Sequence, residues 1–141
     1  MVLVARREIT VEWGDCDPAG IVYYPRYFAW FDACTIGLFE LGTGLRKIDL
    51  LRTYNIVGFP MVDTRGRFMH PSKFGDVLVI ETCISEFRAT SFNVEHKLFR
   101  DGILAVEGFE TRVWVGLHPD DEDHIHSHPI PEDVIAKLMN D

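Results

Sequence analysis

Two carboxylates and a thiol lie side by side in a turn-rich stretch, at Asp15, Cys16 and Asp17. A carboxylate at the mouth of a loop can act as a nucleophile or as a general base that activates water. Spacing alone does not separate Asp15 from Asp17, and an aspartate before Pro18 is also a common turn former, which is the interpretation that composition alone favours. A nucleophilic Cys16 would need a histidine base, yet the first histidine is His70, which has no motif around it. We therefore expect carboxylate chemistry at this loop.

A third carboxylate, Asp32, falls in the middle of an apolar segment. A charge in such a place is costly unless it is paired or hydrogen-bonded. A partner on the same helix would lie three or four positions away, and those positions carry no basic side chain. They are Phe28, Ala29, Thr35 and Ile36. Asp32 must therefore find a cation on another element, or it binds a group of a substrate.

The placement of these residues depends on a long helix that we predict for residues 25–41. Apolar side chains recur there at steps of four and three and continue around the other faces, so the helix belongs inside the protein. Its first turn, at Pro25, has unpaired backbone N–H groups and a positive dipole end, which can stabilise an oxyanion. The main stripe consists of Tyr27, Phe31, Cys34, Leu38 and Leu41.

Five extended segments accompany the helix. Alternating residues predict a strand at 8–13, and after a connector near 48–54 turn signals separate four more stretches, for which an antiparallel meander is expected. A short helix is predicted at 132–138. The four stretches are 56–70, 76–87, 92–100 and 104–117. We predict one α+β domain over residues 1–141, in which an antiparallel five-stranded sheet wraps the helix and a second copy completes the burial as a homo-oligomer.

The composition is that of an ordinary globular domain and argues against several partners. The chain has 141 residues, of which 47% are hydrophobic, so a core can form without disulfides or a structural metal. A net charge of −8 disfavours nucleic acid and anionic lipid. No stretch reaches the roughly 18 apolar residues of a membrane span, and the apolar N-terminus is too short for a signal peptide. Three widely spaced cysteines indicate a reducing compartment, and we expect a cytoplasmic protein.

The residues from Trp13 to Pro25, Trp-Gly-Asp-Cys-Asp-Pro-Ala-Gly-Ile-Val-Tyr-Tyr-Pro, closely resemble the signature of the hydroxybenzoyl-CoA thioesterase family. The similarity covers most of the chain and weakens after about residue 117. It continues through residues 30–33, 58–62, 76–84 and 91–92. This resemblance implies the hotdog fold and a homotetrameric acyl-CoA thioesterase. It further implies a dimer of hotdog dimers with active sites at subunit interfaces and no metal or redox cofactor.

The resemblance also implies roles for single residues. Asp17 matches the catalytic carboxylate, whether as nucleophile or as general base. The backbone N–H of Tyr24 matches the group that polarises the thioester carbonyl. Asp32 matches an aspartate that accepts a hydrogen bond from the ring hydroxyl of the substrate, a contact that would discriminate against an aryl group without the hydroxyl.

The coenzyme A end departs from the family pattern. The family places a basic run after the third strand to bind the nucleotide phosphates, and only Arg88 remains of it here, with Ser91 as a further hydrogen-bond donor. On an acidic chain this leaves few cations for a polyanionic ligand. Arg65, Arg67 and Lys73 are the other candidates for that contact.

Four histidines near the end of the chain offer a different chemistry. In the run His-Ile-His-Ser-His, three imidazoles share one side of an extended segment and could capture zinc or nickel. Relatives have a hairpin or loop in this region, which we expect here, and we predict no metal. The histidines are His118, His124, His126 and His128.

The sequence therefore predicts hydrolysis of an aromatic, hydroxybenzoyl-type acyl-CoA to the free acid and CoA. Two alternatives stay open: a thioesterase for short aliphatic or other aryl acyl-CoAs, and a non-catalytic hotdog protein that binds acyl-CoA or a partner. A hotdog dehydratase acting on acyl carrier protein lacks support, because no histidine and carboxylate pair falls at the helix.

Overall fold

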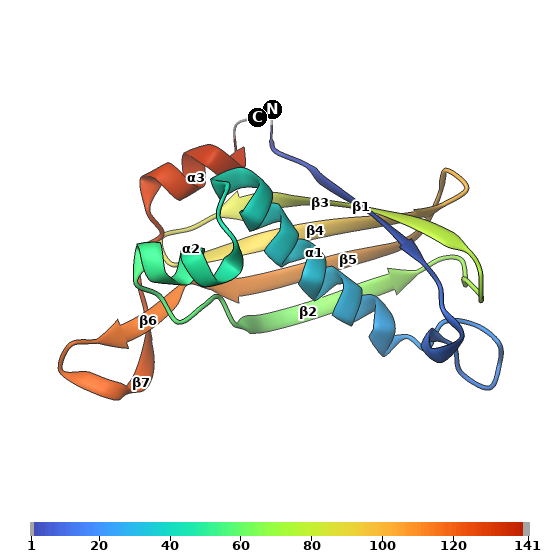
Figure 1. Cartoon of the computed structure of the whole chain (residues 1–141), viewed down its shortest axis with the longest axis horizontal. Coiled ribbons are helices and arrows are strands. Elements are labelled where there is room, and N and C mark those ends of the chain that lie inside the picture. Colours follow the sequence, from blue (N-terminus) through green and yellow to red (C-terminus); the bar gives the residue numbers. More distant parts are fainter. Residues whose placement is uncertain (1, 140–141) are drawn as a thin grey trace.

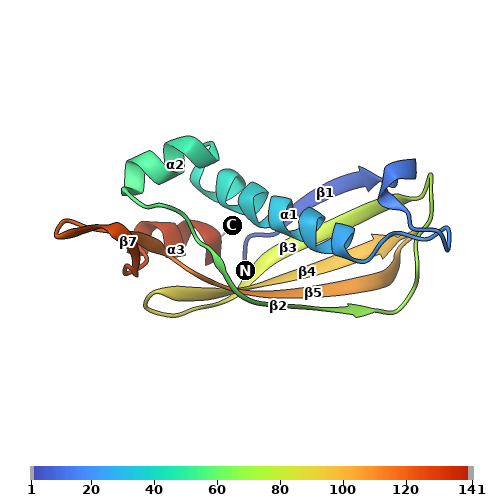
Figure 2. The same cartoon turned by 90° about the horizontal axis from the view of Figure 1, so that it is seen from below.

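A five-stranded antiparallel sheet carries a long helix on one face (Figures 1 and 2). This computed structural model describes residues 2–139, so residues 1, 140 and 141 of the expected domain lie outside the described residues. The strand order is β1-β3-β4-β5-β2. The strands are β1 Ala5–Thr10, β2 Met61–Phe68, β3 Val77–Phe87, β4 Ser91–Arg100 and β5 Ile103–Val113.

Helix α1, Pro25–Thr43, crosses the sheet and confirms the long helix predicted to begin at Pro25. It ends where Gly44 takes a left-handed conformation, φ 72°, and donates its N–H to the carbonyl of Glu40 at 2.9 Å. Leu41 was expected in the buried stripe but is 57% exposed. The buried side chains of the helix are Tyr27, Phe31, Cys34, Thr35, Leu38 and Phe39.

The five expected strands are present, but the expected meander holds only for β3, β4 and β5. β2 pairs with β5 instead of β3, in a register that runs from Met61↔Arg112 to Phe68↔Val106. The expected connector at 48–54 is in fact a second helix, α2 (Lys47–Tyr54). Because α1 and α2 carry the chain over the sheet before β2 begins, β2 joins the edge opposite β1 (Figure 1).

Two other predicted strands end earlier than expected. The strand expected at 8–13 gives way to a short 3-10 helix, η1 (Trp13–Asp15), because the carboxylate of Asp15 accepts the N–H of Glu12 at 2.9 Å. The stretch expected at 104–117 divides at buried Trp114. Beyond it, β6 (Val115–His118) pairs with β7 (Asp121–Ser127) in a separate hairpin, and α3 (Glu132–Met139) confirms the predicted terminal helix.

The side chains under α1 form two buried groups along the helix. One surrounds Phe39 and Trp114 towards the C-terminal end of α1, and the other surrounds Tyr27 and Phe31 towards its start. The second group packs closely against β5, because a Cβ at Gly108 on this strand would lie 2.5 Å from the Phe31 ring. Glycine at this position therefore lets α1 approach the sheet closely. Within residues 2–139 no helix is long and apolar enough to cross a membrane.

Gly108→Ala should lower the free energy of unfolding by about 1–3 kcal/mol, because the added methyl group overlaps the Phe31 ring. Urea unfolding measures this change. Gly37→Ala is the matched control, since its Cβ would meet nothing within 4 Å and alanine favours the helix. Equal stability of Gly108→Ala and wild type would contradict the close approach.

Candidate active site

A compact loop joins η1 to α1 and carries the expected catalytic residues. A bridge between Cys16 and Val22 closes it, and within it the N–H of Asp17 donates to the carbonyl of Ile21 at 2.9 Å. The N–H of Gly20 donates to the carbonyl of Asp17 at 2.9 Å. Gly20 has φ 82°, a conformation that suits glycine. The loop therefore has a defined shape before any ligand is considered.

Asp17 and Asp15 differ in how many of their oxygens are engaged. Oδ1 of Asp17 accepts the N–H of Ala19 at 2.8 Å, so the residue does form the turn that its sequence context suggests. Its Oδ2 accepts no hydrogen bond from the residues that the structure describes. Asp15 uses both carboxylate oxygens, since Oδ2 accepts the backbone N–H of Glu12 and Oδ1 lies 3.7 Å from Nε of Arg26. Asp17 is thus the carboxylate of the pair with an unengaged oxygen.

Cys16 lies between these two aspartates but has no base. Its Sγ donates to the carbonyl of Glu12 at 3.7 Å, and no hydrogen bond joins it to a histidine among residues 2–139. The geometry offers no support for a thiol nucleophile.

The backbone at Tyr24 presents an unpaired donor at the start of α1. Tyr23 donates its N–H to Asp15 at 2.8 Å, Arg26 to Tyr23 at 2.9 Å, and Pro25 has no N–H. Across residues 2–139, no backbone or side-chain acceptor bonds the N–H of Tyr24. This group lies at the positive end of the helix dipole, where it can stabilise a developing negative charge.

A mainly apolar cavity of about 200 Å³ opens beside Tyr24. Three aromatic rings surround it, because Tyr24 and Tyr27 pack against Phe68 of β2 with ring centroids 6.5 and 5.5 Å apart. Its lining is completed by Ile21, Val22, His70 and Pro71. A hydrophobic group of a ligand could lie here, next to the unpaired N–H.

Asp32 has the cationic partner that its own helix cannot supply. The guanidinium of Arg112, on β5, donates to Oδ1 of Asp32 at 2.7 Å. The side chain of Asp32 is 52% exposed, whereas that of Arg112 is only 6% exposed. The expectation that a cation must come from another element is confirmed.

Behind this ion pair lies a buried polar array that we did not predict. Glu110 on β5 accepts Nε of Arg112 at 2.8 Å and Thr35 Oγ1 at 2.7 Å, and its other oxygen lies 3.1 Å from Nε2 of His96 on β4. Nδ1 of His96 lies 2.8 Å from Thr82 Oγ1. We call Glu110, Arg112, His96, Thr35 and Thr82 the buried array.

The charges of the array support one another. Burial alone would raise the pKa of the Glu110 carboxyl, but hydrogen bonds from His96 and Arg112 hold this pKa below its ordinary value. Burial alone would lower the pKa of Arg112, which Glu110 and Asp32 instead raise. A sequence signal for most of the array exists, because Thr82, His96, Glu110 and Arg112 occupy inward-facing strand positions where alternation calls for apolar side chains.

The model of the Thioesterase-like superfamily matches residues 11–138, nearly the whole described chain. The chain belongs to this thioesterase family. A curated relative of this thioesterase, the 4-hydroxybenzoyl-CoA thioesterase of Pseudomonas sp. strain CBS-3, is 37% identical over 133 residues, covering 89% of this chain and 90% of the relative.

Solved structures agree with this assignment. The structure of the same Pseudomonas enzyme superposes on this thioesterase with a TM-score of 0.86 at 32% identity, covering 95% of this chain and 98% of the other. A gentisyl-coenzyme A thioesterase superposes with a TM-score of 0.78 at 33% identity, covering 93% and 99%. The predicted hotdog fold is confirmed.

The two residues expected at coenzyme A lie together but far from Asp17. In this thioesterase Nε of Arg88 donates to Ser91 Oγ at 2.8 Å, and its other nitrogens bond Glu86 at 2.9 Å and Asn93 at 2.7 Å. The turn between β3 and β4 that holds them lies at the opposite end of the sheet from the Asp17 loop (Figure 1). The 11 residues of β3, which runs between these two ends of the sheet, span about 35 Å.

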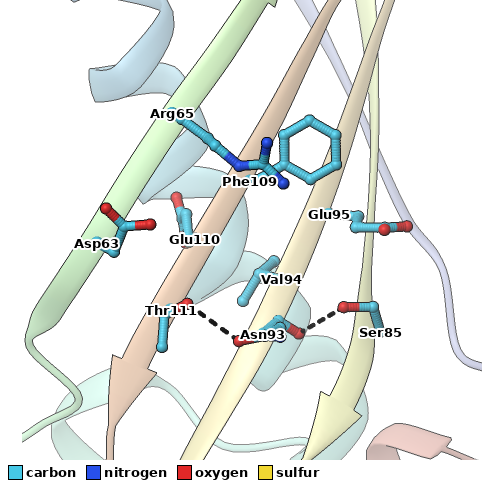
Figure 3. A pocket seen from close by; sticks show the side chains of 9 residues that line it. All are labelled: Asp63, Arg65, Ser85, Asn93, Val94, Glu95, Phe109, Glu110 and Thr111. Carbon is cyan, nitrogen blue, oxygen red and sulfur yellow. Dashed lines mark hydrogen bonds between the residues drawn. The ribbon is translucent and has the colours of Figure 1, made fainter.

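The other basic candidates lie in different parts of the structure. Arg65 stacks over Phe109 at 4.5 Å, beside a polar cavity of about 210 Å³ on the face that points away from α1 (Figure 3). Lys73 and Arg100 instead line a cavity of about 440 Å³ that includes Ile21 of the Asp17 loop. Of Arg65, Arg67 and Lys73, it is Lys73 that lines this cavity next to the Asp17 loop.

The histidine run forms the exposed β6–β7 hairpin. Asp121 accepts a bond from His124 at 2.8 Å and one from His126 at 3.0 Å, and these bonds lower its pKa. No group of three or more metal-binding side chains occurs in the part of the chain that the structure describes.

Glu110→Gln should reduce the stability of the chain in a pH-dependent way. Because the pKa of Glu110 is lowered on folding, its stabilisation is complete above the ordinary value of 4.5 and is lost as the pH falls through the folded value. At neutral pH we expect the free energy of unfolding of the variant to be about 3 kcal/mol below that of wild type. This difference should shrink as the pH falls below the pKa of Glu110 in the folded protein. Urea unfolding over a pH series measures it.

Exposed Glu122 is the control, since Glu122→Gln removes a carboxylate from the hairpin outside the array. A Glu110→Gln deficit that does not change between neutral and acid pH would show that the charge of Glu110 does not stabilise the fold.

Proposed function

We propose that this acyl-CoA thioesterase hydrolyses an aromatic, hydroxybenzoyl-type acyl-CoA to the free acid and CoA. The observation that carries the proposal is that one short loop holds both an unengaged Asp17 oxygen and the unpaired N–H of Tyr24. The 37% identity to an enzyme named 4-hydroxybenzoyl-CoA thioesterase supports the choice of substrate. A solved structure of that enzyme, as a mutant complexed with 4-hydroxybenzoyl CoA, is 33% identical to this chain.

The proposed chemistry uses few groups. The thioester carbonyl accepts a hydrogen bond from Tyr24 N–H, which stabilises the oxyanion of the tetrahedral intermediate. Asp17 either attacks the acyl carbon, giving a mixed anhydride that water then hydrolyses, or removes a proton from an attacking water. The CoA thiolate leaves without a strong acid because a thiol pKa is only about 8.5.

We assign the acyl group to the apolar side of the start of α1. The aromatic cavity beside Tyr24 supports an apolar acyl chain or ring, and Asp32 is the proposed acceptor for a ring hydroxyl. Other aryl groups are the second candidate, since a gentisyl-coenzyme A thioesterase is 33% identical to this chain.

We further propose a homotetramer, a dimer of dimers, with residues 1–141 as one domain in each subunit. One copy separates Asp17 from Arg88 and Ser91 by the length of β3, so a site that uses all three needs two subunits. The edge strand β2 supports an interface, since apolar Met61, Val62 and Phe68 are exposed along it. A cytoplasmic location is part of the proposal and rests on the three cysteines, which are free.

Thiol release from 4-hydroxybenzoyl-CoA, benzoyl-CoA and a short aliphatic acyl-CoA tests this function directly. We expect wild type to prefer the hydroxylated aryl substrate, and Asp17→Asn to lower kcat by about 10²–10⁴-fold because it removes the attacking or activating carboxylate. Steady-state kinetics with a thiol reagent measure both effects.

Asp15→Asn is the matched control, because Asp15 caps η1 and contacts Arg26. It should lower the melting temperature while the folded protein keeps its turnover. Near-wild-type turnover by Asp17→Asn would remove Asp17 from the mechanism. If wild type prefers the aliphatic acyl-CoA, the proposed aromatic acyl group is wrong. If it binds acyl-CoA tightly without releasing thiol, the protein is a binding protein and not a hydrolase.

If each active site takes residues from two subunits, two inactive variants should restore activity when they form mixed dimers. Asp17→Asn and Arg88→Ala subunits, mixed at random within dimers, should recover about a quarter of the wild-type activity at low substrate, because half of the sites in each mixed dimer are intact. Co-expression with two affinity tags isolates the mixed dimers, which on their own should keep about half of the wild-type activity. Activity no higher than the mean of the two parents would place both residues in one subunit's site.

A further inference from the structure

The guanidinium of Arg112 donates from all three nitrogens to acceptors in three separate parts of the chain. Nε donates to Glu110 on β5 at 2.8 Å, and the two terminal nitrogens donate to Asp32 on α1 at 2.7 Å and to the carbonyl of Phe59 at 3.2 Å. Phe59 lies in the segment between α2 and β2. The planar fork of arginine suits this task, whereas the single ammonium of lysine cannot reach three acceptors in these directions.

The rest of the buried array fixes the guanidinium. Glu110 is 1% exposed and accepts bonds from Arg112, Thr35 and His96. The His96 ring stacks on Phe31, the neighbour of Asp32 on α1, with centroids 4.6 Å apart and planes 11° from parallel. Arg112 therefore has little freedom, and neither does the oxygen of Asp32 to which it donates.

This arrangement leaves Asp32 with one oxygen fixed and one open. Oδ1 is bonded to Arg112, while Oδ2 accepts no hydrogen bond from any described residue, and the side chain is half exposed. A ligand that covers Asp32 removes its water, which is costly for an isolated carboxylate. The charge of Arg112 offsets this cost, so Oδ2 can accept a hydrogen bond from a hydroxyl on the covering ligand.

We propose that Arg112, fixed by Glu110 and His96, is the positioning residue that makes Asp32 a selective acceptor for a ring hydroxyl. The proposal rests on the aryl-CoA hydrolysis proposed above and adds the groups that set its selectivity. Arg112 touches no reacting atom and acts through Asp32.

A purely structural role for Arg112 makes a different prediction. It would lower stability, and with it the yield of folded enzyme, but would leave the ratio of kcat/KM for 4-hydroxybenzoyl-CoA over benzoyl-CoA unchanged. This ratio therefore separates the two roles, because the concentration of folded enzyme cancels from it.

The test compares this ratio in wild type, Arg112→Lys, Asp32→Ala and the double variant. We expect Arg112→Lys to lower the ratio at least about tenfold, with benzoyl-CoA hydrolysis changed less than about threefold. The double variant should match Asp32→Ala, since Arg112 acts through Asp32. Arg46→Lys is the control, because Arg46 is an exposed arginine paired with Asp49 outside the site, and its ratio should equal that of wild type.

Thermal melting verifies that each variant is folded, and the isosteric Glu110→Gln supplies the same comparison if Arg112→Lys does not fold. A folded variant of either kind with the wild-type ratio overturns the proposal. Wild type that hydrolyses both thioesters equally also overturns it, yet leaves aryl-CoA hydrolysis standing. Wild type that releases no thiol from either substrate overturns the proposed function itself.

Discussion

The buried charge of Arg112 is the constraint on which the position of α1 over the sheet depends. The side chain of Arg112, on β5, is only 6% exposed and needs anionic partners, which Asp32 on α1 and Glu110 on its own strand supply. These ion pairs link the helix to β5, and Gly108 lets the Phe31 ring pack directly against the same strand. The electrostatic and the steric contacts thus fix the same part of the helix over the sheet.

That fixed helix determines what its first turn can do. The loop before α1 closes on itself through backbone bonds and ends with an unpaired N–H at Tyr24. The same loop carries an Asp17 carboxylate oxygen that accepts no bond among the described residues. A site for acyl transfer needs little more than such a pair. Binding the acyl group and the coenzyme is a separate task, which the proposed function divides between two subunits.

Local sequence patterns predicted much of the fold, whereas they did not predict which strands pair over long distances in the sequence. The apolar spacing from Tyr27 to Leu38 and the start at Pro25 identified α1, and the turn signals identified five strands. The position of β2 next to β5 depends on α1 and α2 carrying the chain across the sheet, which periodicity does not report. For Asp32, the sequence showed that a partner must come from elsewhere, but Arg112 lies 80 positions away and only the register identifies it.

A structure of the Asp17→Asn variant with bound 4-hydroxybenzoyl-CoA tests most directly where the acyl group lies. We predict the thioester oxygen within hydrogen-bond distance of Tyr24 N–H, and the ring hydroxyl on the open oxygen of an Asp32 still paired with Arg112. A ring hydroxyl that contacts neither Asp32 nor its equivalent in a second subunit, or a thioester oxygen away from Tyr24, would contradict the account.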